Sequence, residues 1–199
     1  MKNALCLFMF LPLFSIAQVD LKKIKLSPDT QDSVLGTSLI LKENTILFQK
    51  VYESELSKSE LKIALQSFLP AVKSFQLTDI TNQTEYQFSG RLSDYNINYR
   101  KFGGTFIDAP SLLNYPIIAN VIIQVKDNKY RVTISEIIFK SLLITTNAPN
   151  DRELDDVLTR KERTLIKTNS NAQSVGYFLD KDLSLAFDIK KTKKLSTEF

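Results

Sequence analysis

Carboxylates have the greatest scope for chemistry in this sequence, because it contains no histidine. Without histidine there is no Ser–His pair, no imidazole base and no imidazole metal ligand. A carboxylate-dependent hydrolase would need a pair of acidic side chains a few ångströms apart in a concave site. The spacing of Asp79, Asp94 and Asp108 does not predict such a pair. We expect these residues in turns and at strand ends.

The densest acidic cluster has the composition of a calcium site without its spacing. It consists of Asp151, Glu153, Asp155 and Asp156. Oxygen ligands suit Ca²⁺, but the Asp-x-Asp-x-Asp-Gly order of a calcium loop is missing. Acidic side chains in the first turn of a helix are favoured by the helix dipole without any ion. We interpret the cluster as a solvated helix start, with a calcium site as the alternative.

The segment NYRKFGG, residues 98–104, combines cations, aromatic rings and a glycine pair. It lacks the Gly-x-x-x-x-Gly-Lys-Ser/Thr spacing of a phosphate loop. With Arg91 and Arg131 it has the residue types that contact phosphates and stack on bases. A strand that ends in a turn explains the same residues, because their alternation stops at the glycines. We expect that structural role, and no nucleic-acid partner.

The N-terminus has the pattern of a secretory signal peptide. Lys2 precedes an apolar run over residues 4–14, and a small-x-small cleavage site ends at Ala17, before Gln18. The run is shorter than the roughly 20 residues that a membrane-spanning helix needs. We therefore predict that the signal peptide, residues 1–17, is cleaved between Ala17 and Gln18. The protein would then be exported to a bacterial periplasm, to the cell surface or out of the cell.

Cleavage would leave a mildly basic chain without cysteine. Cys6, the single cysteine, lies in the leader, so we expect no disulfide, zinc–thiolate site or cysteine nucleophile in the mature chain. The 26 Lys and Arg against 22 Asp and Glu give a formal charge of +4. Losing Lys2 reduces that charge to +3, which predicts no strong polyanion partner. We expect no cofactor and no transmembrane segment.

Local patterns predict strands and a capped helix. A strand is expected over residues 45–53, and Ser57 with Glu60 forms a capping box for a helix that Pro70 kinks or ends. The apolar face of that helix would be Leu61, Ala64, Leu65, Phe68 and Leu69. Further strands are predicted within 75–81, 85–92, 116–126 and 130–139, with the last two joined in a hairpin through Asp127, Asn128 and Lys129.

The predicted organisation is a single α+β domain over residues 45–190. Residues 18–44 are expected to form an arm or linker, in which TSLILK adds a short edge strand. A helix is expected over 148–166. Residues 175–190 fit either a helix or a strand, and we favour a helix because the sheet needs one face covered. Residues 191–199 are predicted to be a basic flexible tail.

The order strand, capped helix, antiparallel strands and helix resembles that of a known family. The segments that carry the resemblance are ILFQKVYESELSKSELKIALQSFL, the pair Gly103-Gly104, and VKDNKYRVTISEI. They resemble the secreted Bacteroidetes domain of unknown function 4468 family, which has a TATA-box-binding-protein-like fold. The resemblance covers about residues 45–139. It implies a mostly antiparallel sheet with helices packed on one face, in β-α-β-β-β-β-α order. The family has no established activity, so no catalytic residue is carried over.

The sequence favours a non-enzymatic envelope or periplasmic module that binds a ligand or an envelope protein. Its binding surface would be the open sheet face and the loop 103–116, because long loops between strands commonly carry function. The candidate residues are Arg91, Tyr99, Arg100, Phe102, Gln124 and Arg131. The alternatives are a carboxylate-dependent hydrolase and a structural protein that pairs a sheet edge with another chain.

Overall fold

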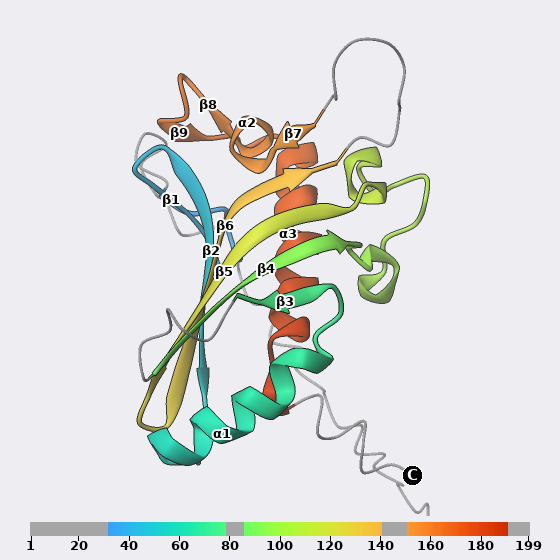
Figure 1. The fold of residues 1–199 in the computed structure, drawn as a ribbon. Helices are drawn as coiled ribbons and strands as arrows, with labels where there is room; N and C mark the ends of the chain where they lie inside the picture. The colour runs from blue at the N-terminus through green and yellow to red at the C-terminus, as the bar shows by residue number, and fades with distance from the viewer. Residues whose placement is uncertain (1–31, 79–85, 141–150, 191–199) are drawn as a thin grey trace, which may run out of the picture.

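The computed structural model describes residues 32–78, 86–140 and 151–190 (Figure 1). The predicted leader and C-terminal tail, and Asp79, lie outside the described residues. In chain order the elements are β1 (Leu39–Lys42), β2 (Thr45–Glu53), α1 (Lys58–Phe68), β3 (Phe75–Leu77), β4 (Gln87–Tyr95), β5 (Ile117–Lys126), β6 (Lys129–Phe139), β7 (Arg152–Glu153), α2 (Leu154–Leu158), β8 (Thr159–Arg160), β9 (Leu165–Ile166) and α3 (Ser170–Ala186).

One antiparallel sheet organises the domain. Its strands lie in the order β1-β2-β6-β5-β4-β3, and β7 pairs with the end of β6. The strands β8 and β9 form a separate small hairpin. The α+β class is therefore confirmed. The series β2-α1-β3-β4-β5-β6-α3 follows the β-α-β-β-β-β-α order expected from the sequence.

Helix α3 covers one face of the sheet (Figure 1). Alternation along the strands decides which side chains meet it, because successive residues of a strand point to opposite faces. The residues of β5 and β6 predicted to be buried are all buried: Ile117, Ala119, Val121, Ile123, Val125, Tyr130, Val132 and Ile134. Ile137 and Phe139 at the end of β6 are buried as well. Residues Val175, Leu179, Leu183 and Phe187 come from α3 and its C-terminal end, and belong to the same core. The helix prediction for this segment is thereby confirmed.

Helix α1 begins and ends where the sequence predicted. The Ser57 hydroxyl accepts from the Glu60 amide, and the Glu60 carboxylate accepts from the Ser57 amide, which completes the capping box. Its buried residues are Leu61, Leu65 and Phe68. The helix stops at Phe68, and Pro70 lies in the 3₁₀ turn Leu69–Ala71 that follows.

Removing this cap tests how much the first turn of α1 contributes to stability. Ser57→Ala is expected to lower the free energy of unfolding by about 1 kcal/mol, because the Glu60 amide loses its acceptor. Chemical denaturation followed by circular dichroism measures the difference. Ser59→Ala, two residues further along in the first turn, is the matched control and should change stability by less than half as much. Equal effects of the two changes would contradict a capping role for Ser57.

The hairpin between β5 and β6 also follows its prediction. Lys126 pairs with Lys129 across a turn in which Asn128 has a φ of 60°, a conformation that asparagine tolerates.

At the end of the sheet away from this hairpin, the strands carry irregularities that the sequence did not indicate. Register shifts in β4 and β6 coincide with positive φ values at Asp94 and Glu136. Such β-bulges bend a strand and end regular pairing.

The prediction of one helix over 148–166 is wrong. Residues 148–150 are outside the described residues, and α2 spans only Leu154–Leu158 before the chain turns back through the β8–β9 hairpin. Residues 160–164 are all polar, so a continued helix would bury no apolar side chain there. The turn instead has positive φ at Lys161, Glu162 and Arg163.

The N-terminal arm also needs correction. The expected edge strand is present as β1, but it pairs with β2 and Leu39 is fully buried. Val34 is buried as well and would contact a side chain placed at Gly176 of α3. Residues 34–42 are therefore integral to the domain, rather than part of a linker before it. Residues 18–31 lie outside the described residues.

Candidate functional site

The face of the sheet opposite α3 is the candidate site, and we call it the open face. It looks toward the viewer in Figure 1. Strand alternation and the pairing register together place side chains from four strands on this face. These are Leu47, Gln49 and Val51 of β2, Arg131, Thr133 and Ser135 of β6, Asn120, Ile122 and Gln124 of β5, and Gln87, Ser89 and Arg91 of β4.

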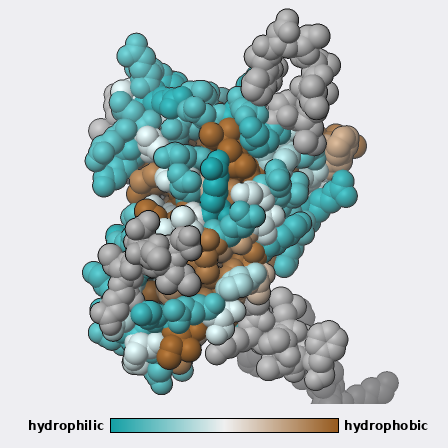
Figure 2. All heavy atoms as spheres, viewed as in Figure 1, coloured by the Kyte–Doolittle hydropathy of each residue, from teal (hydrophilic) through white to brown (hydrophobic). Residues whose placement is uncertain are grey.

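Apolar side chains interrupt the polar rows of this face. Val51 is 51% exposed and Ile122 is 39% exposed. Val51 lies opposite Arg131 and Ile122 lies opposite Thr133 in the pairing register. Figure 2 shows apolar atoms along the middle of the same view. The same register places Arg131 and Thr133 of β6 between Val51 and Ile122, so the two are separate apolar points within a polar face.

A hollow of about 600 Å³ lies at the hairpin end of the open face. The Arg131 guanidinium donates to the Gln124 side-chain oxygen, and Gln124 Nε2 donates to Gln87 Oε1 at 3.2 Å. This chain of bonds fixes the orientation of the polar side chains across three strands. Val51 and the ring of Tyr86 add apolar surface to the same hollow.

The open face is more cationic than anionic. Arg91 and Arg131 are exposed on it, and Lys126 and Lys129 line the hollow. The ammonium of Lys58 lies 3.5 Å from the centre of the Tyr86 ring, at the edge of the same region. Such a field attracts a partner that carries carboxylates.

The structure divides the predicted binding residues between separate surfaces. Arg91, Gln124 and Arg131 lie on the open face. Tyr99, Arg100 and Phe102 belong to the 3₁₀ helix η4 (Tyr99–Phe102), which contacts α3 on the covered side. Val51 and Ile122 were not predicted as candidates, although apolar residues at polar positions of the alternation were a usable signal.

The segment 98–104 is a turn that follows the strand. Strand β4 ends at Tyr95, and Gly103 closes η4 with a φ of 86°, a conformation suited to glycine. Tyr99 is buried, donates to Asn114 Oδ1 at 2.8 Å and has its ring centre 6.2 Å from that of Phe178. The expected alternation of burial is therefore present, but it comes from packing against α3 after the strand has ended.

Arg163 forms ion pairs with three of the four residues in the acidic cluster. These ion pairs join it to Glu153 at 2.7 Å, Asp155 at 3.3 Å and Asp156 at 2.9 Å. Asp151 pairs with Lys140. The interpretation as a solvated helix start holds in part: Asp155 and Asp156 lie in the first turn of α2 and Glu153 is its N-cap, but Asp151 precedes the helix and the carboxylates are ion-paired. In the described ranges, no group of acidic residues has the arrangement of a metal site.

Asp155 is less solvated than the sequence suggested. Burial raises the pKa of its carboxyl group, while the Ile46 amide, which donates to Oδ1 at 2.8 Å, and the Arg163 charge oppose the rise. This bond ties α2 to the start of β2. Asp155 therefore has a structural role between two elements.

The other carboxylates considered for acid–base chemistry belong to different turns. Asp94 lies at the bulge near the end of β4. Asp108 accepts from the Thr105 hydroxyl at 2.6 Å in the loop after η4. The two carboxylates belong to separate turns, and no contact between the turns brings them together as a pair within the described residues.

Sequence reasoning did not identify Asp182, a buried carboxylate on α3. Asp182 accepts from the Tyr95 hydroxyl at 2.9 Å and from the Asn98 amide at 3.2 Å, both at Oδ2. Burial raises the pKa of this carboxyl group, and the hydrogen bonds and the nearby Lys101 and Lys73 charges oppose the rise. Its position three residues after Leu179, within the apolar face of a helix, was the available signal.

Comparison with known proteins finds similarity among solved structures. No protein-family model and no curated protein sequence matches the chain. A TBP-like protein from Parabacteroides distasonis has a TM-score of 0.47 and 14% identity, over 74% of this chain and 94% of that one. A DUF4468 family protein from Bacteroides ovatus has a TM-score of 0.47 and 13% identity, over 77% of this chain and 91% of that one. The sequence resemblance named the same family and the same fold.

Within the described ranges, none of the helices has the length and apolar character to cross a membrane.

Proposed function

We propose that this chain is an exported, non-enzymatic module that binds an extended segment of a protein partner on its open face. The observation that carries the proposal is the exposure of Val51 and Ile122 among oriented Arg and Gln side chains. Exposed apolar residues account for affinity, because partner binding removes them from water. Flanking polar groups fix the register of the partner.

The partner segment is inferred to be acidic and apolar. Arg131 and the lysines at the hollow favour carboxylates, while Val51, Ile122 and the Tyr86 ring favour aliphatic or aromatic side chains. The hollow has the volume of a small-ligand site, so it accommodates one or two side chains of a longer segment. The remainder of the segment would lie along the flatter part of the sheet.

Export is proposed from the signal-peptide pattern in residues 1–17. Mass spectrometry of the protein recovered from the exported fraction of its own cells tests this part. A mature chain that begins at Gln18 would support cleavage after Ala17. An intact N-terminus would contradict it without affecting the binding proposal.

Selection from a displayed library of random peptides tests the binding surface. We expect enriched sequences that combine Asp or Glu with large apolar residues. For a selected peptide, joint replacement of Ile122 by Ser and Arg131 by Ala should weaken binding by about tenfold or more, as truncation of central interface residues commonly does. Titration calorimetry measures the change.

The matched control is Ile63→Ser, which removes an apolar side chain of 63% exposure from α1. It should leave peptide affinity unchanged. Thermal unfolding of each variant verifies that the fold is intact. Peptides that lack acidic residues, or that bind the open-face variant as tightly as the parent chain, would contradict the proposal.

A further inference from the structure

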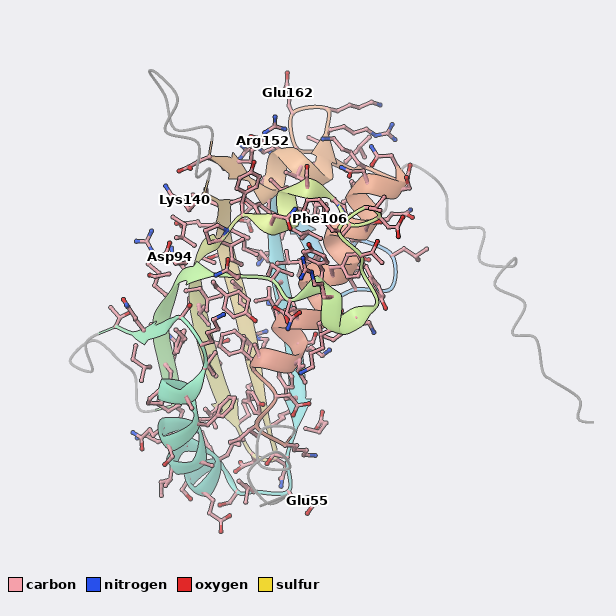
Figure 3. All side chains as sticks on the ribbon, turned by 90° about the vertical axis from the view of Figure 1, so that its right-hand side faces the viewer. Glu55, Asp94, Phe106, Lys140, Arg152 and Glu162 are labelled. Carbon is pink, nitrogen blue, oxygen red and sulfur yellow. The ribbon has the colours of Figure 1, made fainter. Side chains whose placement is uncertain are left out.

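A second surface with unusual exposure lies at residues 105–108, which we call the tip. Phe106 is 70% exposed and Ile107 is 91% exposed. The tip is a fixed turn: the Thr105 hydroxyl donates to Asp108 Oδ2 at 2.6 Å, and the Ala109 amide donates to the Thr105 carbonyl at 2.9 Å. Two large apolar side chains are thus held in water by a locally bonded backbone. Figure 3 shows Phe106 on this loop.

The segment before the tip fixes it against α3. A Cβ at Gly104 would lie 2.9 Å from the Phe178 ring and 2.9 Å from the Tyr99 ring, so the backbone approaches both rings closely. The 3₁₀ helix η4 contacts α3 through the same rings. Tyr177, next to Phe178 on α3, is 43% exposed. The tip is therefore part of the covered side of the sheet, away from the open face.

Cations accompany these apolar groups. Arg100 and Lys101 are exposed on η4, and Lys181 lies 5.5 Å from the centre of the Tyr177 ring. Neither Arg100 nor Lys101 forms an ion pair within the part of the chain that the structure describes. The surface therefore combines protruding apolar side chains with exposed cations, of which Lys101 also lies close enough to act on the Asp182 carboxylate.

We propose that the tip, with Arg100 and Lys101, docks the protein on an anionic lipid surface. Protruding Phe and Ile side chains enter the boundary between headgroups and acyl chains, where burial of apolar area stabilises peripheral binding. Arg and Lys beside them contact anionic headgroups, and an exposed Tyr suits the interface. Because the turn is already ordered, docking requires little loss of backbone freedom. The inference is independent of partner binding on the open face.

A single tryptophan at the tip tests insertion directly, because the chain contains no other tryptophan. The exported protein with Phe106→Trp is mixed with vesicles of phosphatidylglycerol. We expect a blue shift of the emission and quenching by brominated acyl chains, both weakened by added salt. Ile63→Trp, on exposed α1, is the control and should show neither. Emission from position 106 that stays unchanged with these vesicles would overturn the proposal and favour a protein pocket as the partner of the tip.

Co-sedimentation with the same vesicles tests the native side chains. Joint replacement of Phe106 and Ile107 by Ser should lower the partition coefficient by about tenfold or more, and Ile63→Ser should leave it unchanged. All variants have the same N-terminal sequence, so any contribution of residues 1–31 to vesicle binding is the same in each and does not affect the comparison. Equal sedimentation of the tip variant and the parent chain would overturn the proposal. Equal binding to phosphatidylcholine vesicles would overturn its electrostatic part.

Discussion

Gly90→Ala is expected to lower the free energy of unfolding by about 3 kcal/mol, at the upper end of the range for overpacked cores. Gly90 is buried in β4, where it pairs with Leu77 of β3 and Val121 of β5. A Cβ at this position would lie 2.4 Å from Cζ of Phe75 and 2.5 Å from the carbonyl oxygen of Gln76. The ring could rotate or shift, but the carbonyl belongs to the paired strand. Relief therefore requires β3 to move away from β4.

Urea denaturation at neutral pH measures this change, with Ser89→Ala as the matched control. Ser89 is the adjacent residue of β4 and lies on the open face, so its truncation should alter stability by less than about 0.5 kcal/mol. A stability of Gly90→Ala close to that of the parent chain would show that β3 separates from β4 at little cost. The edge of the sheet would then be looser than the close contact with Phe75 indicates.

The parts of the fold that sequence reasoning predicted are those that depend on short-range periodicity. Alternation in β5 and β6 identified the side chains under α3, and the Asp127-Asn128 turn identified their hairpin. The Ser57–Glu60 pair gave the start of α1. Each of these signals lies within a few residues, because strand alternation, turn conformation and helix capping are local properties.

The features that were not predicted depend on contacts between distant segments. Alternation continued from Tyr95 to Tyr99 even though the strand had ended, because the Tyr95 hydroxyl bonds to Asp182 and the Tyr99 ring packs on Phe178, both on α3. Asp94 and Glu136 both have left-handed conformations. Aspartate tolerates this conformation, but glutamate rarely adopts it, so residue type gave no signal of the bulge in β6. Alternation within β5 was enough to place Ile122 among polar residues, but register across strands was needed to place Val51 on the same face.

The candidate site illustrates the same division. Sequence reasoning identified Arg91, Gln124 and Arg131 as open-face residues from alternation within their own strands. It grouped them with Tyr99, Arg100 and Phe102 because these have suitable side chains. The structure separates the two groups, since η4 turns to the α3 side of the sheet. Composition indicated which residues suit binding, and only the three-dimensional arrangement shows which of them share a surface.

Asp182→Ala is expected to lower the free energy of unfolding by about 3 kcal/mol, because it leaves one buried donor and one partly buried donor without an acceptor. These donors are the Tyr95 hydroxyl and the Asn98 amide, which both bond to Oδ2 of Asp182. Asp182→Asn should be far milder. A single amide oxygen at the Oδ2 position accepts both bonds, and the uncharged side chain avoids the cost of burying a carboxylate. Urea denaturation of the two variants at neutral pH gives the comparison.

The two variants also predict a pH dependence. Burial raises the pKa of Asp182 in the folded chain, so the folded state holds its proton more tightly than the unfolded state does. The resulting stabilisation is complete below the unfolded-state pKa of about 3.9 and is lost as pH rises through the raised folded-state pKa. Asp182→Asn should abolish this loss, which denaturation at a series of pH values measures against the parent chain.

If Asp182→Asn is instead as unstable as Asp182→Ala at neutral pH, attraction between the carboxylate and Lys73 or Lys101 outweighs the cost of burial. The carboxylate would then act as a charge that holds the turn after β4 onto α3, in addition to accepting the two hydrogen bonds.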